Sequence, residues 1–200
     1  MGCGQSKSGM FANTNGDGND FLNKYNVERI IGQGEFGLVK LVYAKNADDT
    51  PIACKIIRKG MQFKDNTLYA PINPHVLKNE LGILRILNGK HHTLKLIGVY
   101  ESPSTIFILT EYMSGGDMYQ YLTEIYGATG KHDGSQSNMD NDTTSSHQHG
   151  LRTEDVSRMS YQLLDAVNHC AKHDIMHRDI KVRVKILVLH VLCLVIIIIF

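Results

Sequence analysis

The chain has 200 residues, 42% of them hydrophobic, and a formal net charge of +1 at pH 7. These totals suit one globular domain or one and a half, and the balanced charge argues against a nucleic-acid-binding protein. The first ten residues lack an apolar run, so no secretory signal is indicated. The spacing of the four cysteines indicates neither a disulfide framework nor a zinc site, which suits a reducing, intracellular setting.

The N-terminus begins "MGCGQS", which fits the Met-Gly-x-x-x-Ser pattern for N-myristoylation of Gly2. One myristoyl chain binds membranes only marginally, and Cys3 beside it is a candidate for palmitoylation as a second signal. We therefore expect the protein on the cytoplasmic face of a membrane, and otherwise in the cytoplasm. The alternative is an N-terminus that begins Met-Gly by chance.

Residues 1–22 are rich in Gly, Asn, Ser and Asp and are predicted to be a flexible tether. Within them, "NTNGDG" resembles the first half of a calcium-binding EF-hand loop. The twelfth position of such a loop needs a bidentate Glu, and here it is Lys24. We interpret this stretch as linker rather than as a calcium site.

Apolar runs separated by turn residues predict five strands in the first half of the chain. Between the third and the fourth run, residues 75–88 repeat apolar positions at helical spacing and predict one helix. The first half is therefore expected to be a small sheet with one helix inserted after its third strand. The predicted strands are residues 25–32, 37–45, 51–57, 93–101 and 105–112.

The second half is predicted to be helical around a polar insert. A short helix is expected to begin near Asp117, and residues 127–150 are polar and low in complexity, which predicts a disordered surface insert. The insert holds a His pair in "HQH" but no third metal ligand. Residues 153–173 form an amphipathic pattern with Thr153 as the expected N-cap.

A glycine-rich stretch, "GQGEFGLV", joins the first two predicted strands and contains Gly32, Gly34, Gly37 and Val39. Glycines let the backbone approach phosphates closely, because a side chain there would collide with them. A dinucleotide-binding glycine turn opens a helix, whereas this one bridges two strands. The context therefore favours a phosphate-covering loop between strands.

A lysine, Lys55, lies in the third predicted strand, "PIACKII". A lysine inside a buried strand is costly to desolvate unless it is paired, and Glu80 in the predicted helix is the candidate partner. The alternative is an edge-strand lysine that reaches solvent.

Further motifs follow in a fixed order: "LTEYMSGGD" after the fifth strand, and "IMHRDIK" after the second long helix. With these, residues 25–181 resemble the eukaryotic protein kinases of the Ser/Thr type. Within that family the chain is most similar to the calcium- and calmodulin-dependent branch, which includes the calcium-dependent protein kinases. The sub-family resemblance rests on "TEYMSGGDMY" and the Met-Gly-Cys start.

The resemblance implies an α+β fold. Residues 23–112 would form a small lobe with a five-stranded antiparallel sheet and one helix. Residues 113–181 would begin a helical large lobe that is incomplete, and residues 182–200 would be a divergent hydrophobic tail.

The resemblance also implies roles for single residues, with ATP, Mg²⁺ and a protein substrate as ligands. Asp179 would accept the proton of the substrate hydroxyl, and Lys181, which marks Ser/Thr specificity, would contact the transferring phosphate. Lys55, held by Glu80, would contact the α and β phosphates of ATP. The other nucleotide contacts implied are Gly32, Gly34 and Gly37 at the phosphates, Val39 and Ala53 over the adenine ring, the backbone from Glu111 to Met113 along the adenine edge, and Asp117 near the ribose.

The resemblance ends abruptly after Lys181. Val184 stands where the family has a metal-binding Asn, and neither Asp-Phe-Gly nor Ala-Pro-Glu follows. Without both metal ligands we expect little or no phosphoryl transfer. Val182-Arg183 is what the usual start of an intron encodes when read in frame, so a retained intron or a gene-prediction error is our hypothesis for the break.

Residues 186–200 are apolar apart from His190. As a helix they would span about 22 Å, which is marginal for a membrane core of about 30 Å, and their Ile and Val also suit a strand. A segment packed on the base of the incomplete lobe is a third possibility. In such a lobe the helix at 153–173 would expose Leu163, Leu164 and Val167.

The sequence is compatible with three alternative functions. The first is a membrane-tethered Ser/Thr kinase of which this chain is an inactive truncated fragment. The second is a catalytically dead, pseudokinase-like ATP binder, and the third is a tail-anchored membrane protein.

Overall fold

The computed structural model describes residues 14–34, 37–60, 62–64, 67–69, 72–116, 118–127, 151–176, 185–188 and 191–193. The N-terminal residues up to 13 and most of the polar insert, residues 128–150, lie outside these ranges. The predictions of an acylated start and of a disordered insert therefore fall on residues that are not described.

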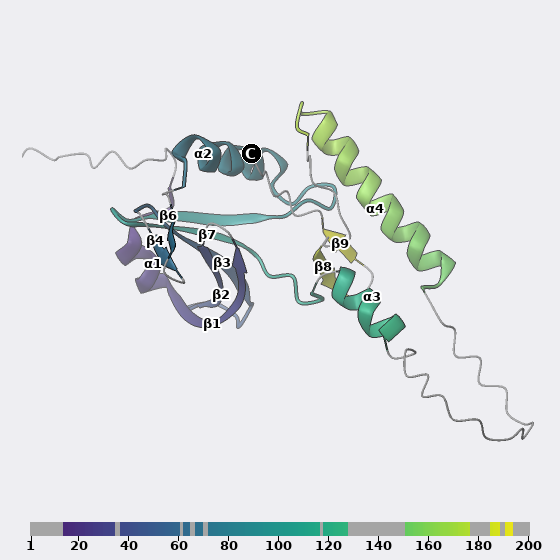
Figure 1. Cartoon of the computed structure of the whole chain (residues 1–200), viewed down its shortest axis with the longest axis horizontal. Helices are drawn as coiled ribbons and strands as arrows, with labels where there is room; N and C mark the ends of the chain where they lie inside the picture. The colour runs from purple at the N-terminus through teal and green to yellow at the C-terminus, as the bar shows by residue number, and fades with distance from the viewer. Residues whose placement is uncertain are drawn as a thin grey trace, which may run out of the picture.

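A five-stranded antiparallel sheet forms the centre of the first half (Figure 1), as the sequence predicted. The strand order β1-β2-β3-β7-β6 places β3 in the middle and β6 at an edge. Two short strands, β4 and β5, form a separate hairpin that the sequence analysis did not predict. The bounds are β1 Tyr25–Gly34, β2 Gly37–Ala44, β3 Ile52–Arg58, β4 Gln62–Lys64, β5 Thr67–Tyr69, β6 Leu96–Glu101 and β7 Thr105–Glu111.

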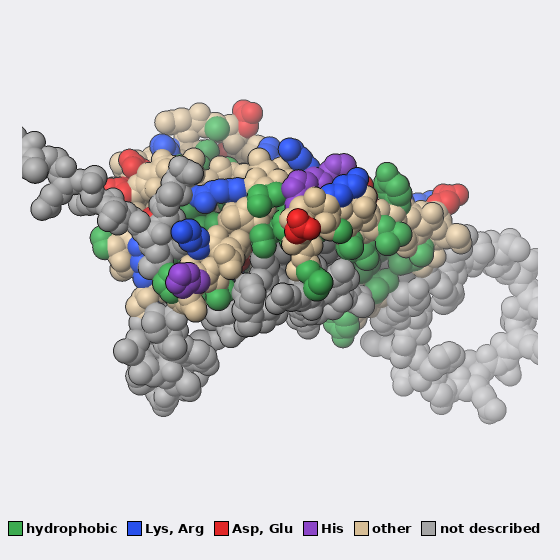
Figure 2. All heavy atoms as spheres, turned by 90° about the horizontal axis from the view of Figure 1, so that it is seen from above, with side chains coloured by type: hydrophobic (Ala, Val, Ile, Leu, Met, Phe, Trp, Pro, Cys, Tyr) green, Lys and Arg blue, Asp and Glu red, His purple; other side chains and the backbone are tan. Residues whose placement is uncertain are grey.

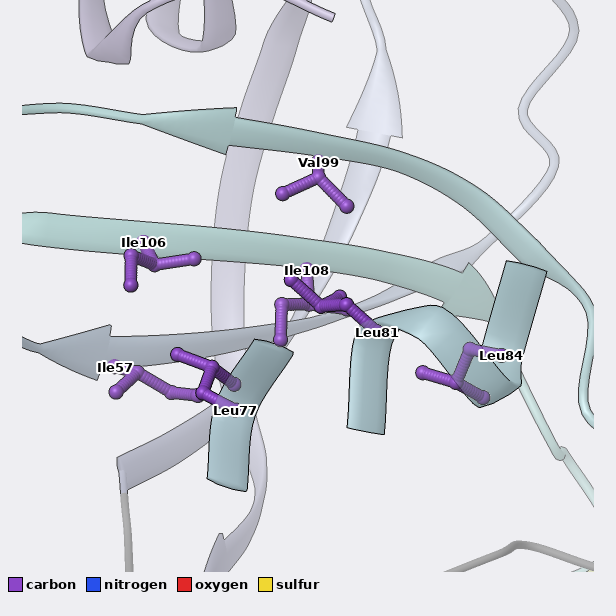
Figure 3. Close-up of a cluster of buried hydrophobic side chains, with 7 residues drawn as sticks. All are labelled: Ile57, Leu77, Leu81, Leu84, Val99, Ile106 and Ile108. Atoms are coloured by element: carbon purple, nitrogen blue, oxygen red, sulfur yellow. The ribbon is translucent and has the colours of Figure 1, made fainter. Parts of the chain in front are cut away.

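One face of the sheet is covered by the predicted helix, α2 (Pro74–Leu87). Asn73 caps its start by accepting a hydrogen bond from the His75 N–H, and Pro74 suits the first helical position, where no N–H is needed. Leucines at helical spacing then turn toward the sheet and form one continuous core with it (Figure 3). The core residues are Ile57, Leu77, Leu81, Leu84, Val99, Ile106 and Ile108.

The other face is covered by a helix that the sequence analysis missed, α1 (Gly18–Lys24). Asp17 and Asp20 form a capping box at its start, which satisfies the first backbone N–H groups. Phe21 is fully buried and stacks on Phe107, with 4.2 Å between the ring centroids. The prediction of a flexible tether up to residue 22 is therefore wrong for residues 14–22.

The segment before α1 is also fixed to the sheet. The Asn15 N–H donates to the Val99 carbonyl at 2.7 Å, and the Glu101 N–H donates to the Gly16 carbonyl at 3.1 Å. Residues 15 and 16 thus cover part of the backbone edge of β6, which would otherwise offer unpaired hydrogen-bonding groups.

The second half contains α3 (Met118–Gly127) and α4 (Thr153–Ala171), as predicted. Thr153 is not the N-cap: that position is Arg152, which makes no capping hydrogen bond through its side chain. Of the three apolar residues expected to be exposed on α4, only Leu164 is, at 67%. Leu163 and Val167 pack against a small core that joins α4 to the end of α2.

The C-terminal tail forms a two-stranded antiparallel hairpin where it is described, with β8 at Lys185–Val188 and β9 at Val191–Cys193. β9 contacts α4 (Figure 1). The described part of the tail is therefore strand rather than helix, and it lies against α4. Within the described ranges, none of the helices combines the length and the apolar character that crossing a membrane requires.

Candidate functional site

The α2 face of the sheet brings together residues from three neighbouring strands. Gly32 of β1 pairs with Val39 of β2, and Val39 pairs with Lys55 of β3. Directly paired residues share a face of the sheet, so these positions form a row across it. Ala53 lies two residues before Lys55 and therefore points to the same side.

An ion pair crosses from this row to α2. The Lys55 Nζ atom lies 2.9 Å from Glu80 Oε1, which is the pairing that the buried lysine predicted. Because β3 is the central strand, the alternative of an edge-strand lysine does not apply. The Lys55 side chain keeps 28% of its surface exposed, against 14% for Glu80, so the ammonium can still reach a second anion.

The position of Glu80 follows from the packing of α2. Glu80 lies next to Leu81 and three residues after Leu77, both of which are fully buried against the sheet. Those contacts fix how the helix is rotated, and a carboxylate at position 80 is thereby directed at β3. Hydrophobic packing thus holds the charged pair in place.

The glycines of the β1–β2 connection have different roles. At Gly37 an added Cβ would lie 2.1 Å from the Ile56 carbonyl oxygen, so the close approach of β2 to β3 requires glycine. At Gly32 the nearest atom is Val39 Cβ at 3.7 Å, an ordinary contact. The described contacts therefore do not require glycine at 32. Gly34 pairs with Gly37 where the two strands meet.

The end of β7 is fixed by Glu111. Its N–H donates to the Lys95 carbonyl at 3.1 Å, and its Oε1 accepts from the Lys95 N–H at 2.7 Å. One oxygen of the Glu111 carboxylate is therefore engaged within the protein. Met113, two residues on, is buried at 9% exposure.

Cys54 lies between Ala53 and Lys55 in sequence but on the opposite face of the sheet. Burial raises the pKa of its thiol to about 12, so it stays protonated at neutral pH. It belongs to the core under α1 and is no nucleophile for the site.

Several predicted site residues lie outside the described ranges, so the structure does not place them. They are Gly2, Cys3, Asp117, Asp179 and Lys181.

Within the described residues, no group of three or more His, Cys, Asp or Glu side chains is arranged to hold a metal ion. The sequence adds that Val184 has no oxygen where the expected pattern has an Asn. A valine side chain at this position offers Mg²⁺ none of the oxygen ligands that it prefers.

One buried ion pair was missed by the sequence analysis. Lys59 Nζ lies 2.5 Å from Glu101 Oε1, with the side chains 15% and 5% exposed. The pair ties the segment after β3 to the end of β6, and no local pattern links two residues so far apart in the chain. It lies at the sheet's edge rather than in the row of Gly32, Val39 and Lys55.

Comparison with known proteins gives a family match over most of the chain. The model of the protein kinase domain matches residues 25–188. The chain is similar to serine/threonine-protein kinase SIK2 of Gallus gallus, with 31% identity over 157 residues, and to serine/threonine-protein kinase SIK1 of Mus musculus, with 30% identity over 158. It is also 28% identical over 161 residues to CBL-interacting serine/threonine-protein kinase 24 of Arabidopsis thaliana.

These matches cover 78% to 80% of this chain. They cover 16% of each of the two animal proteins and 29% of the plant protein. The chain therefore spans only a small part of the length of these relatives.

Proposed function

This chain belongs to the protein kinase domain family, and on that premise we propose that it is the ATP-binding part of a serine/threonine protein kinase. The observation that carries the proposal is the Lys55–Glu80 ion pair, which lies in a row with Val39 and Gly32 on one face of the sheet. A cation with an exposed side, next to bare backbone, is suited to phosphate oxygens.

In this proposal the residues of the row divide the binding of ATP between them. Lys55 contacts the α and β phosphates, and Glu80 holds its ammonium in position. The backbone at Gly32 and Gly34 approaches the phosphates, and Val39 and Ala53 cover the adenine ring. The adenine edge meets the backbone from Glu111 to Met113, and the ribose lies near Asp117.

The chemical step is proposed to depend on the "HRDIK" segment. When bound, ATP supplies the phosphoryl group. Asp179 orients the substrate hydroxyl and accepts its proton, and Lys181 contacts the phosphate that is transferred. Protein serine or threonine residues are the proposed substrates, in accordance with the names of the relatives.

For these 200 residues by themselves we propose nucleotide binding with little or no turnover. Val184 cannot bind a metal ion, and the Asp-Phe-Gly motif is not among them. Phosphoryl transfer needs metal ions to neutralise the charge that develops on the phosphates. By themselves, these residues would thus behave as a catalytically dead, pseudokinase-like ATP binder.

The test measures ATP binding by calorimetry and transfer of labelled phosphate to a generic basic peptide, both with Mg²⁺. The proposal expects binding without transfer, and an Asp179→Asn variant that binds ATP as the parent does. Absence of ATP binding by the folded chain would contradict the proposed function. Transfer that Asp179→Asn abolishes would show that the missing metal ligands are not decisive.

We also propose membrane attachment through acylation of Gly2 and Cys3, supported by the "MGCGQS" motif. Two chains are expected to give stable binding where one gives only marginal binding. In cells, Gly2→Ala should move the protein from the membrane to the soluble fraction. A Gly2→Ala protein that resists carbonate and needs detergent for extraction would instead support an anchor elsewhere, such as the hydrophobic tail.

A further inference from the structure

Histidines gather where α4 meets the loop between α2 and β6 (Figure 2). His91 and His92 come from the loop, whereas His169 and His173 come from the end of α4 and the turn after it. The His169 ring lies 4.3 Å from the His91 ring and 4.6 Å from the His173 ring, between centroids. We call these four residues the histidine cluster.

His169 is the buried centre of the cluster. It is 8% exposed, and its Nε2 atom is buried without a hydrogen-bond partner. A buried polar atom with no partner is uncommon and costs stability. Protonating this ring would add a charge beside a buried nitrogen that has no hydrogen-bond partner.

The neighbours of His169 are mostly basic. Lys90 and His91 act on it from the loop, and His92 beside them lies 3.9 Å from Asp165. His173 lies on the turn after α4, where the His173 Nδ1–H donates to the His169 carbonyl at 2.9 Å. Burial and the charges of His91, His173 and Lys90 lower the pKa of His169. The adjacent Cys170 adds no charge, because burial raises the pKa of its thiol.

Asp165 is the carboxylate that opposes this basic group. It accepts hydrogen bonds from His91 Nδ1 at 3.1 and 3.2 Å, and it lies 3.9 Å from His92 Nε2. One carboxylate can balance one positive charge, and it is already in contact with the two loop histidines. A charge on His169 would therefore share Asp165 with His91 and His92 rather than gain a counter-charge of its own.

The loop itself is held in a tight conformation. Asn88, Gly89, His91 and His92 all have positive φ values, between 39° and 75°. These φ values define the course of the loop backbone that carries His91 and His92. Beside them, Leu87 at the end of α2 packs against Ala166 and Cys170 of α4.

We propose that the histidine cluster is a pH-sensitive contact between α4 and the α2–β6 loop. It holds α4 against the loop at neutral pH and weakens as the solution becomes acidic. Because the folded protein favours the neutral His169 ring, the unfolded chain binds a proton more readily. The stabilisation is complete above the ordinary histidine pKa of about 6.5 and is lost as the pH falls below it.

The test measures the free energy of urea unfolding of the full chain at several pH values from 5.5 to 7.5, with EDTA present to exclude metal effects. If unfolding takes up one proton at His169, the folding equilibrium constant falls by up to about tenfold per pH unit. His169→Phe and His169→Gln should both flatten this pH dependence, whatever they do to stability at pH 7.5.

The matched control is His75→Gln, which replaces an exposed histidine at the start of α2. It should keep the pH dependence of the parent. If both His169 variants keep the slope of the parent, or if His75→Gln flattens it equally, the proposal is wrong. Hydrogen exchange, corrected for its intrinsic pH dependence, should show that α4 loses protection first as the pH falls. Uniform loss of protection over the whole sheet would contradict a local contact.

Discussion

The two faces of the five-stranded sheet carry different kinds of side chain, although the same strands supply both. In β3, Ala53, Lys55 and Ile57 point to the α2 face, whereas the alternate residues Ile52 and Cys54 point to the α1 face. The α2 face holds an ion pair that stays partly open to solvent. The core on the α1 face consists of apolar and aromatic residues.

Aromatic side chains make up much of this core. Tyr25 packs against Phe21 and Tyr100, and burial together with a hydrogen bond to Tyr100 raises the pKa of the Tyr25 hydroxyl to about 12. Alternation along β3 thus places Lys55, the proposed phosphate contact, beside core residues that face the other way. Substitutions on the two faces should accordingly separate the two properties.

The largest effect is expected at Phe21, on the α1 face. Phe21→Ala removes a fully buried ring and should cost about 3–5 kcal/mol of unfolding free energy. Urea unfolding measures this loss. The neighbouring Leu22 is 54% exposed, so Leu22→Ala should change stability by less than about 0.5 kcal/mol. Equal losses at both positions would mean that α1 does not dock as described.

On the α2 face, Leu81→Ala should cost about 2–5 kcal/mol, because Leu81 is fully buried between helix and sheet. Unlike Phe21→Ala, it should also weaken ATP binding by the molecules that remain folded, since Leu81 fixes the neighbouring Glu80. The control in the same helix is Ile86→Ala, at a position 49% exposed. If folded Leu81→Ala protein binds ATP with unchanged affinity, the packing of Leu81 does not control the position of Glu80.

A smaller effect is expected from the cap of α1. Asp17→Ala removes the side chain that accepts from the N–H groups of Asn19 and Asp20, and should cost about 0.5–2 kcal/mol. Asp17→Asn keeps an acceptor oxygen and should recover most of the loss. Thermal unfolding distinguishes the two variants, and equal destabilisation by both would argue that charge rather than capping matters.

The smallest effect on stability is expected at Lys55. The pair with Glu80 is partly exposed, and such pairs contribute about 0–1 kcal/mol. Lys55→Met should therefore leave the urea midpoint nearly unchanged. A loss as large as that of Phe21→Ala would show that the pair serves stability, and the contrast between the two faces would fail.

The sequence predicted the sheet and α2 because alternation and helical periodicity persist over each element. It missed α1 because seven residues with one buried aromatic, Phe21, show no periodicity. The three-residue strands β4 and β5 were missed for the same reason. Such short elements depend on contacts that are distant in the chain.

Some features of the candidate site could also be predicted from the sequence, and others could not. The Lys55–Glu80 pair was predictable, because a lysine in a central strand needs a nearby anion. The histidine cluster was not, since His91 and His169 meet only when α4 docks on the loop, and neither lies in a motif. The different roles of Gly32 and Gly37 also needed coordinates, because both fit the same glycine pattern.

The central claim is that the α2 face of the sheet binds ATP through Lys55. The most direct measurement compares ATP affinity in Lys55→Met and Lys40→Met by calorimetry. Lys40 of β2 pairs with Cys54 and so lies on the α1 face. Losing a charged hydrogen bond to phosphate should weaken binding by about tenfold or more in Lys55→Met. Lys40→Met should bind like the parent, whereas equal affinities in both variants would contradict the account.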